Sequence, residues 1–221
     1  TKSKVGRKLY LMVLTVFLVF AVSFIMFQQT REKQYKISTL TMKLENYNAL
    51  LEEDLSLAHD RGIILSNGDS LETLPSVSRS KLVVAETKLN AFIREHESKD
   101  LRVTLIRSDG KVVYDNMSKH YDRFANHLNR KEIQEALKNG QGSSVERESK
   151  TLKQDYFYVA SYFPADSIII RSALPYNDDL SKSLQADQHY IWFAVFAIII
   201  LTIVLYRFTH RLGKNVAKLR I

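Results

Sequence analysis

Two apolar stretches near the ends of the chain constrain its architecture more than any other feature. Residues 9–27 carry no charged side chain over nineteen positions, and residues 190–206 carry none over seventeen. At a rise of about 1.5 Å per residue, each stretch is long enough as a helix to cross most or all of a hydrocarbon core about 30 Å thick. The 162 residues between them (28–189) have the composition of an ordinary water-exposed domain. The sequence therefore predicts two transmembrane helices with one folded domain between them.

The charges that flank the two stretches predict the orientation in the membrane. Nine Lys and Arg residues lie in the two tails, residues 1–8 and 207–221, and neither tail contains an acid. An excess of Lys and Arg marks cytoplasmic flanks. We therefore expect both termini in the cytoplasm and residues 28–189 outside it.

The basic composition of the whole chain comes from these tails. All 24 Asp and Glu lie in residues 28–189, together with 23 of the 32 Lys and Arg, so this segment has a formal charge of −1. The net charge of +8 and the pI near 9.5 thus report membrane topology. No nucleic-acid partner is expected, although a high pI can mark one in other proteins.

A cleaved signal peptide is the alternative for the first apolar stretch. The stretch is longer than the usual apolar region of about 7–15 residues in such peptides, and no small-x-small cleavage site follows Phe27. A retained anchor is the favoured interpretation. The chain contains no cysteine, which excludes disulfides and thiolate chemistry.

A long helix is predicted from residue 28 to about residue 65, continuous with the first apolar stretch. It has no Pro or Gly before Gly62, and its apolar residues recur at alternating three- and four-residue steps. This face can cover a sheet in its own monomer, or it can pair with the same helix of a second copy in a parallel homodimer, and both roles can hold at different heights. The residues predicted for the dimer contact are Ile37, Leu40, Leu44, Tyr47 and Leu51.

The remainder of the middle segment predicts an α+β domain. Further helices are expected at residues 80–97, 130–138 and, leading into the second apolar stretch, 176–188. Alternating, β-branched sequence with hairpin signals predicts strands at residues 101–107, 111–115, 143–148, 155–163 and 167–174. The order predicts a five-stranded antiparallel sheet with helices packed on one face. The fourth and fifth strands are apolar on both sides and should be central and covered on both faces.

Several short segments of this domain share a pattern with a known family. The segments are RVTLI at 102–106, DGKVVYD at 109–115, NHLNRKEIQEAL at 126–137, the pair Gly140 and Gly142, and Tyr158-Val159-Ala160. The pattern resembles the extracytoplasmic PAS-like sensor of the Cache (PDC) type in bacterial sensor histidine kinases, especially those of the phosphate-regulon and cell-wall-stress types. Proline commonly precedes the Glu-Ile of the short helix in that family, and Lys131 stands there in this chain. Residues 207–221 look like the first turns of a HAMP linker.

The resemblance implies a PAS-like sheet and a role in signalling. It implies the input region of a homodimeric two-component sensor histidine kinase in the bacterial inner membrane, in contact with membrane lipid and stimulated by a small ligand or an envelope protein. Catalysis, ATP, Mg²⁺ and the response regulator would belong to a cytoplasmic kinase outside these residues. The alternatives are the sensor of a chemoreceptor or diguanylate cyclase, and a membrane-anchored module that docks an envelope protein without signalling.

The resemblance also implies where a ligand would bind. The pocket of a PAS-like sensor lies between the sheet and the loop that carries the short helix, which makes Arg107, Tyr114, Tyr158 and Arg171 the candidate ligand-binding residues. The two arginines interrupt apolar strands and would suit a carboxylate or phosphate. The alternative is that they reach solvent from a strand end or edge.

Neither a catalytic site nor a metal site is expected in the chain. Asp115, His120, Asp122 and His127 are ligand types in one loop, but they lack i, i+4 spacing, so solvated loop side chains are the favoured interpretation. No Gly-x-Ser-x-Gly motif is present, and the six histidines are scattered. The chain itself is therefore expected to be no enzyme and to hold no cofactor.

Overall fold

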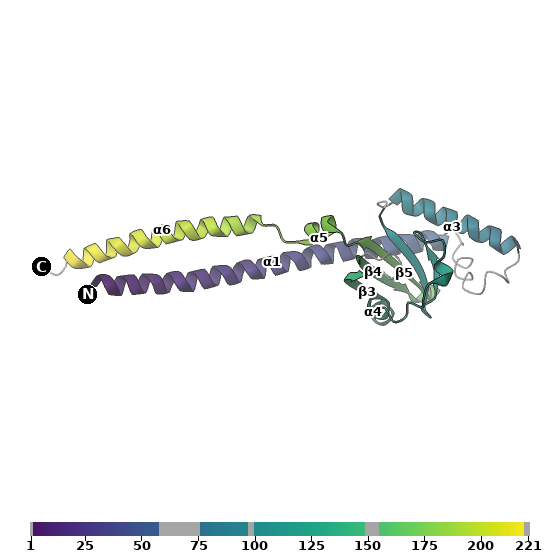
Figure 1. Ribbon diagram of the computed structural model, residues 1–221, viewed down its shortest axis with the longest axis horizontal. Helices are drawn as coiled ribbons and strands as arrows, with labels where there is room; N and C mark the ends of the chain where they lie inside the picture. Colours follow the sequence, from purple (N-terminus) through teal and green to yellow (C-terminus); the bar gives the residue numbers. More distant parts are fainter. Residues whose placement is uncertain (1, 58–75, 97–99, 149–154, 219–221) are drawn as a thin grey trace. The chain divides into compact units, whose positions relative to one another are not determined.

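The computed structural model describes residues 2–57, 76–96, 100–148 and 155–218, which fall into two compact units (Figure 1). We call residues 38–183 the sheet domain. Residues 1–37 and 184–221 contain two apolar helices and are called the helix-pair unit.

The sheet domain is built on five strands in the order β2-β1-β5-β4-β3, with every neighbouring pair antiparallel (Figure 1). The bounds are β1 Arg102–Arg107, β2 Val112–Asp115, β3 Gln141–Glu148, β4 Asp155–Phe163 and β5 Ile168–Pro175. The predicted α+β fold with a five-stranded antiparallel sheet and a long N-terminal helix is confirmed. The expectation that the fourth and fifth strands lie inside the sheet is also confirmed, because β5 is central and β4 lies between β5 and β3.

Helices cover both faces of this sheet, so the expectation that they pack on one face was wrong. Successive residues of the central strand show the two sides. Arg171 contacts Glu132 of helix α4 (Lys131–Asn139), whereas Ser172 contacts Asn48 of helix α1 (Lys2–Leu57). The strands β4 and β5 are apolar on both sides, and such strands need cover on both.

Helix α1 covers one face with a stripe of buried residues. Leu44, Tyr47 and Leu51 are at most 4% exposed and are therefore buried within the chain's own core. Between them Asn48 donates to the Ile170 carbonyl and the Ser161 hydroxyl, both at 3.1 Å.

This burial assigns the sheet-covering role to most of the predicted dimer seam. Leu44, Tyr47 and Leu51 have no surface left for a second copy, whereas Ile37 and Leu40 are only half-buried. A dimer through this helix stays a prediction, and its contacts have to lie outside the buried stripe.

Helix α3 (Ser76–His96) lies on the same side of the sheet as α1. Its residues Ala85, Leu89 and Ile93 are buried, and its Asn90 accepts a 2.7 Å hydrogen bond from the Tyr114 hydroxyl of β2. The predicted helix at 80–97 is confirmed and begins earlier, at Ser76. The predicted end of the first helix near residue 65 lies outside the described residues.

On the opposite face, α4 packs closely against the start of β3. Gly140 ends the helix with a φ of 86°, and its N–H donates to the Ala136 carbonyl. Two residues later Gly142 lies so close to α4 that an added Cβ would be 2.2 Å from the Glu132 carbonyl oxygen. The small residue at 142 thus lets the sheet and α4 approach each other.

The connector after β5 differs from the prediction of a helix running into the second apolar stretch. Helix α5 (Asp178–Leu184) ends, residues 185–188 are not helical, and helix α6 (His189–Lys218) then begins. Side chains of α1 satisfy the backbone of this break: Lys36 Nζ donates to the Gln185 carbonyl at 2.7 Å, and the Asp187 N–H donates to Glu32 Oε1 at 3.1 Å. These contacts replace the backbone bonds that a continued helix would make.

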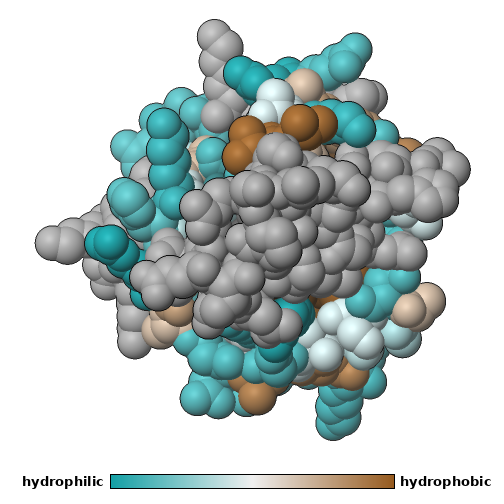
Figure 2. Space-filling model, turned by 90° about the vertical axis from the view of Figure 1, so that its right-hand side faces the viewer, coloured by the Kyte–Doolittle hydropathy of each residue, from teal (hydrophilic) through white to brown (hydrophobic). Residues whose placement is uncertain are grey.

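Exposed apolar surface is concentrated on the helix-pair unit. The helical segments Tyr10–Ser56 and His189–Phe208 are long and apolar enough to cross a membrane, and their most apolar windows contain no buried residue. In the sheet domain, by contrast, the hydrophobic side chains that are coloured in Figure 2 form small separate groups among hydrophilic ones.

The two glycines after α4 give a test of the packing at this face. We expect Gly140→Ala to cost about 1–2 kcal/mol, because only its left-handed backbone conformation is strained and nothing lies within 4 Å. Gly142→Ala should cost about 3 kcal/mol or more, because its Cβ meets backbone atoms that cannot turn aside. Urea unfolding followed by near-UV circular dichroism measures both, and equal costs would contradict the close packing of α4.

Candidate functional site

The structure brings together two of the four predicted ligand-binding residues. The Arg171 guanidinium carbon lies 4.8 Å from the centre of the Tyr158 ring, on the α4 face of the sheet. Tyr114 is buried but lies on the other face, against α3, and burial raises its pKa. Arg107 is at the end of β1, partly exposed, where it pairs with Asp109.

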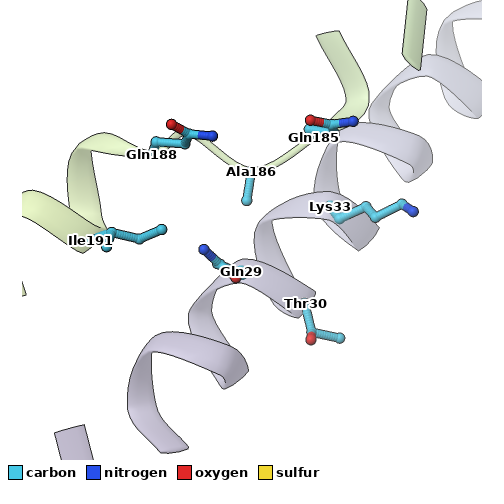
Figure 3. A pocket seen from close by; sticks show the side chains of 7 residues that line it. All are labelled: Gln29, Thr30, Lys33, Gln185, Ala186, Gln188 and Ile191. Atoms are coloured by element: carbon cyan, nitrogen blue, oxygen red, sulfur yellow. The ribbon is translucent and has the colours of Figure 1, made fainter. Parts of the chain in front are cut away.

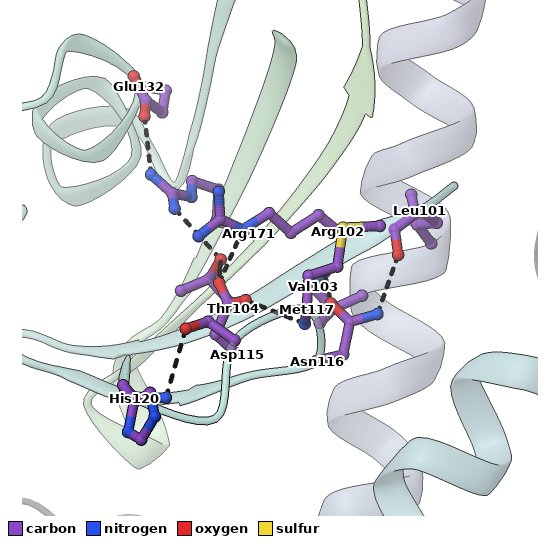
Figure 4. Close-up of polar contacts among 11 residues, drawn as sticks. Leu101, Arg102, Val103, Thr104, Asp115, Asn116, Met117, His120, Glu132 and Arg171 are labelled. Carbon is purple, nitrogen blue, oxygen red and sulfur yellow. Dashed lines mark hydrogen bonds and ion pairs between the residues drawn. The ribbon is translucent and has the colours of Figure 1, made fainter. Parts of the chain in front are cut away.

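Arg171 belongs to a chain of charged and polar side chains that crosses three strands and reaches α4 (Figure 4). Its Nη1 donates to Glu132 Oε1 at 3.3 Å and its Nη2 to Thr104 Oγ1 at 3.2 Å. Thr104 in turn donates to Asp115 Oδ2 at 2.9 Å, and the same oxygen accepts from Arg102 Nε at 2.8 Å. We call these five residues the ionic network.

Every member of the ionic network is at most 4% exposed. Two guanidinium groups and two carboxylates give it no net formal charge, which matters because an unpaired buried ion is strongly destabilising. Burial lowers the pKa of Arg171 to about 10, while the charge of Glu132 acts in the opposite direction. Arg171 therefore remains a cation at neutral pH.

The strand register accounts for the positions of the network. Thr104 is paired with Asp115 across β1 and β2 and with Arg171 across β1 and β5. Side chains of directly opposite residues lie on the same face of a sheet, so these three must meet. Glu132 comes from the first turn of α4, where a carboxylate interacts favourably with the helix dipole.

An aromatic and imidazole pair lies beside the network. The Phe124 ring is 5.6 Å from the Arg102 guanidinium carbon and stacks on His127, with the ring centres 6.2 Å apart. The His127 side chain is buried, and its Nδ1 is 2.6 Å from the Ala125 carbonyl. Burial is the main cause that lowers the pKa of His127 to about 3, and the positive charge of Arg171 acts in the same direction.

Glu132 occupies the place on Arg171 that a ligand carboxylate would take. A carboxylate or phosphate ligand would therefore have to displace Glu132, which would break the contact between α4 and the centre of the sheet. Arg171 Nε is a buried donor for which the described residues offer no acceptor. The ion pair between Glu132 and Arg171 thus joins α4 to β5 without a net charge, and we call this ion pair the latch.

The loop that the sequence suggested for metal ligation has a different role. Asp115 lies in β2 and pairs with Arg102, and His127 is buried, so the interpretation of both as solvated loop residues was wrong. His120 is exposed, and the Asp122 side chain lies outside the described residues. Within the described part of the chain, no group of three or more His, Asp or Glu is placed to hold a metal ion.

Sequence reasoning missed four members of the network: Arg102, Thr104, Asp115 and Glu132. A signal was present for the two in β1, because Arg102 and Thr104 alternate with Val103 and Leu105 and so share one face of a buried strand. Asp115 and Glu132 had no comparable signal, since an acid at a strand end or in a first helical turn is common at the surface.

Comparison with protein families finds no matching family, and no characterised protein matches the sequence. Some solved sensor domains do match in structure. A Cache chemosensory domain described for carboxylic acid recognition is 12% identical over 59% of this chain and 96% of its own length, with a TM-score of 0.34. The periplasmic sensor domain of a chemotaxis protein is 14% identical over 61% of this chain and 98% of its own, with a TM-score of 0.33.

The ligand-binding domain of the Campylobacter jejuni chemoreceptor Tlp3, solved in complex with L-valine, also matches. It is 18% identical over 72% of this chain and 66% of its own length, with a TM-score of 0.38. At these identities and TM-scores, the likenesses assign neither a family nor a ligand to this chain.

A double-mutant cycle tests the latch between α4 and β5. We expect Glu132→Leu and Arg171→Met each to lower the free energy of unfolding by about 3–5 kcal/mol, because each leaves a buried charge unpaired. The double variant should recover most of that loss, since both charges are then gone. Asp109→Asn, in the partly exposed pair with Arg107, should cost less than about 1 kcal/mol. Additive losses in the double variant would contradict the pairing.

Acid should destabilise the domain through His127. Its pKa is about 3 in the folded chain and about 6.5 when unfolded, so between these values only the unfolded state binds the proton. As the pH is lowered through this window, the free energy of unfolding should therefore decrease, by up to about 1.4 kcal/mol per pH unit from this group. His127→Gln should remove that part of the slope, as measured by urea unfolding between about pH 7.5 and 4.5. Equal slopes in the two proteins would contradict the burial of a neutral imidazole.

Proposed function

We propose that this chain is the sensor region of a two-pass transmembrane receptor with its sheet domain outside the cytoplasm. The observation that carries the proposal is helix α1, which runs unbroken for 56 residues. Its first part is apolar and exposed, and its last part supplies the buried stripe of Leu44, Tyr47 and Leu51 against the sheet. A core element of the sheet domain is thus the direct continuation of a candidate membrane span.

The exposed apolar side chains support membrane insertion of both helices. Phe20, Phe24, Phe193 and Phe196 are each more than half exposed, and helices that are apolar on all sides need lipid or protein around them. The basic tails support the orientation with both termini in the cytoplasm, because neither tail carries an acid.

Signal relay is proposed to use the two covalent routes out of the sheet domain. One is α1, and the other runs from β5 through α5 and the residues 185–188 into α6. Helix α6 continues to Lys218, past the end of the apolar stretch at residue 206, so a shift of this helix would reach the segment that resembles a HAMP linker. Helix shifts of about 1–2 Å are sufficient in known switches.

We propose a histidine kinase as the output, with ATP, Mg²⁺ and a response regulator as its cofactors and partner. The resemblance of residues 102–160 and 207–221 to sensor kinases supports this choice. There are two alternatives to a kinase output. One is a chemoreceptor or diguanylate cyclase output, and the other is an interaction module that does not signal. The sequence of the full-length protein distinguishes them, since a kinase requires a phospho-accepting histidine and an ATP-binding domain.

The stimulus is proposed to act on the latch. A small anionic ligand would replace Glu132 on Arg171, whereas an envelope protein would act from outside on α4 or the loop before it. Either event would change the population of two arrangements of the domain only in proportion to its differential affinity for them.

Reporter fusions test the topology. We expect a fusion after Ile221 to be active only in the cytoplasm and a fusion near Asn139 only outside it, because basic flanks stay inside. Fusions reporting the same side of the membrane would contradict the two-pass arrangement.

Cysteine crosslinking tests the proposed homodimer, since the chain contains no cysteine of its own. We expect single cysteines at the half-buried positions 37 and 40 to crosslink between copies in membranes, and cysteines at 44, 47 and 51 to fail because these side chains are inside the monomer. A profile without dependence on position would contradict a dimer contact along α1.

A further inference from the structure

A cavity of about 310 Å³ lies within the helix-pair unit, between α1 and the break that precedes α6 (Figure 3). Gln29, Thr30 and Lys33 line it from α1. Gln185, Ala186 and Gln188 line it from the break, and Ile191 from the first turn of α6. In Figure 3, Gln29, Ala186 and Ile191 point toward its centre.

Ion pairs and a hydrogen bond of Lys36 hold the residues 185–188 side of this cavity against α1. Lys36 lies 3.5 Å from Glu32 and 3.7 Å from Asp187, in addition to its hydrogen bond with the Gln185 carbonyl. These contacts fix the break onto α1. Both carboxylates share the single ammonium of Lys36, so this group of three keeps one formal negative charge, equal and opposite to the charge of Lys33.

Apart from Thr30, whose hydroxyl donates to the Met26 carbonyl at 2.9 Å, the polar side chains of the lining have no partners among the described residues. Within the described residues, Lys33 makes no ion pair or hydrogen bond, and the side-chain amides of Gln29 and Gln188 make none. Lys33 and Gln29 are one helical turn apart, so both lie along the same side of α1. The cavity thus offers amide N–H groups to an anion, together with the Lys33 ammonium once that side chain, which points away from the cavity centre in Figure 3, turns toward it.

The other part of the lining is apolar and leads toward the candidate spans. Ile191 belongs to the apolar stretch of α6, next to the exposed Trp192 and Tyr190. The apolar stretch of α1 ends at Phe27, two residues before Gln29. In a membrane-spanning chain, both helices leave the hydrocarbon core at this level, and aromatic side chains of this kind gather at the headgroup region.

We propose that this cavity binds the headgroup of an anionic phospholipid. Lys33 and the amides of Gln29 and Gln188 would bind the phosphodiester, and an acyl chain would run past Ile191 along α6. Basic pockets between membrane helices are suited to anionic headgroups, whereas the residues that line this cavity include no carboxylate to pair with the quaternary amine of a zwitterionic lipid. The inference rests on the proposed membrane anchoring.

The bound lipid would contact both connections between the sheet domain and the membrane. One side of the cavity is α1, and the other is the break that joins α5 to α6. Lipid composition would therefore bias the relay independently of any stimulus bound by the sheet domain.

Fluorescence of Trp192, the single tryptophan of the chain, provides the test. The full chain is reconstituted in phosphatidylcholine vesicles that contain a small fraction of phosphatidylglycerol or phosphatidylcholine with brominated acyl chains, which quench nearby tryptophan. We expect brominated phosphatidylglycerol to be preferred about fivefold at this position, the effect of about one Lys near an anionic headgroup.

The preference should be lost in Lys33→Gln and in Ala186→Phe, which fills the cavity. The matched control is Arg31→Gln, which removes one positive charge two residues away, from a side chain that lies over the Phe27 ring and does not line the cavity. It should keep the preference. Equal losses in Lys33→Gln and Arg31→Gln would show general surface electrostatics and overturn the proposal.

Two further outcomes separate the remaining explanations. Loss of the preference on adding inorganic phosphate would mean that the site takes a free anion, and would overturn the lipid assignment. Release of the chain from membranes by alkaline carbonate would overturn the proposed function together with this inference. An integrated chain without lipid preference would overturn this inference alone.

Discussion

The contact between Glu132 and Arg171 is the interaction on which the α4 side of the sheet domain depends. It joins a short helix to the central strand, and it neutralises a guanidinium group that the sheet places in its own interior. Without the carboxylate, Arg171 would hold α4 away from the sheet, because a buried cation needs water or an anion. The close approach at Gly142 and the burial of Ile133 lie at the same interface between α4 and the sheet. The strength of this side of the domain is therefore electrostatic as well as hydrophobic.

The two faces of the sheet are stabilised in different ways. On the α1 face, apolar side chains and the amide of Asn48 fill the space, and Asn48 bonds to uncharged carbonyl and hydroxyl groups. On the α4 face, four charged side chains lie within one connected set. Changes in pH or competing anions act on charges, so they should loosen α4 well before they affect the packing of α1.

The arrangement of elements could be predicted from the sequence, because it depends on local signals. Alternation in residues 101–107, the Asp109-Gly110 turn and Asn139-Gly140 each define a boundary within a few residues of the observed one. The break at 185–188 could not be predicted, since it contains no Pro or Gly and is held by Lys36 and Glu32, about 150 residues earlier. The candidate site was found only in part for the same reason. Arg171 and Tyr158 were recognised by residue type, but their neighbours are set by strand register and by the docking of α4.

The break before α6 gives the two connections of the sheet domain unequal mechanical properties. A continuous helix such as α1 resists both twisting and bending. A non-helical segment of four residues transmits tension along its length but has a lower torsional stiffness. A piston-like displacement would therefore pass along both connections. A rotation would pass directly along α1, whereas at the break it would depend on the contacts that Lys36 and Glu32 make with residues 185 and 187.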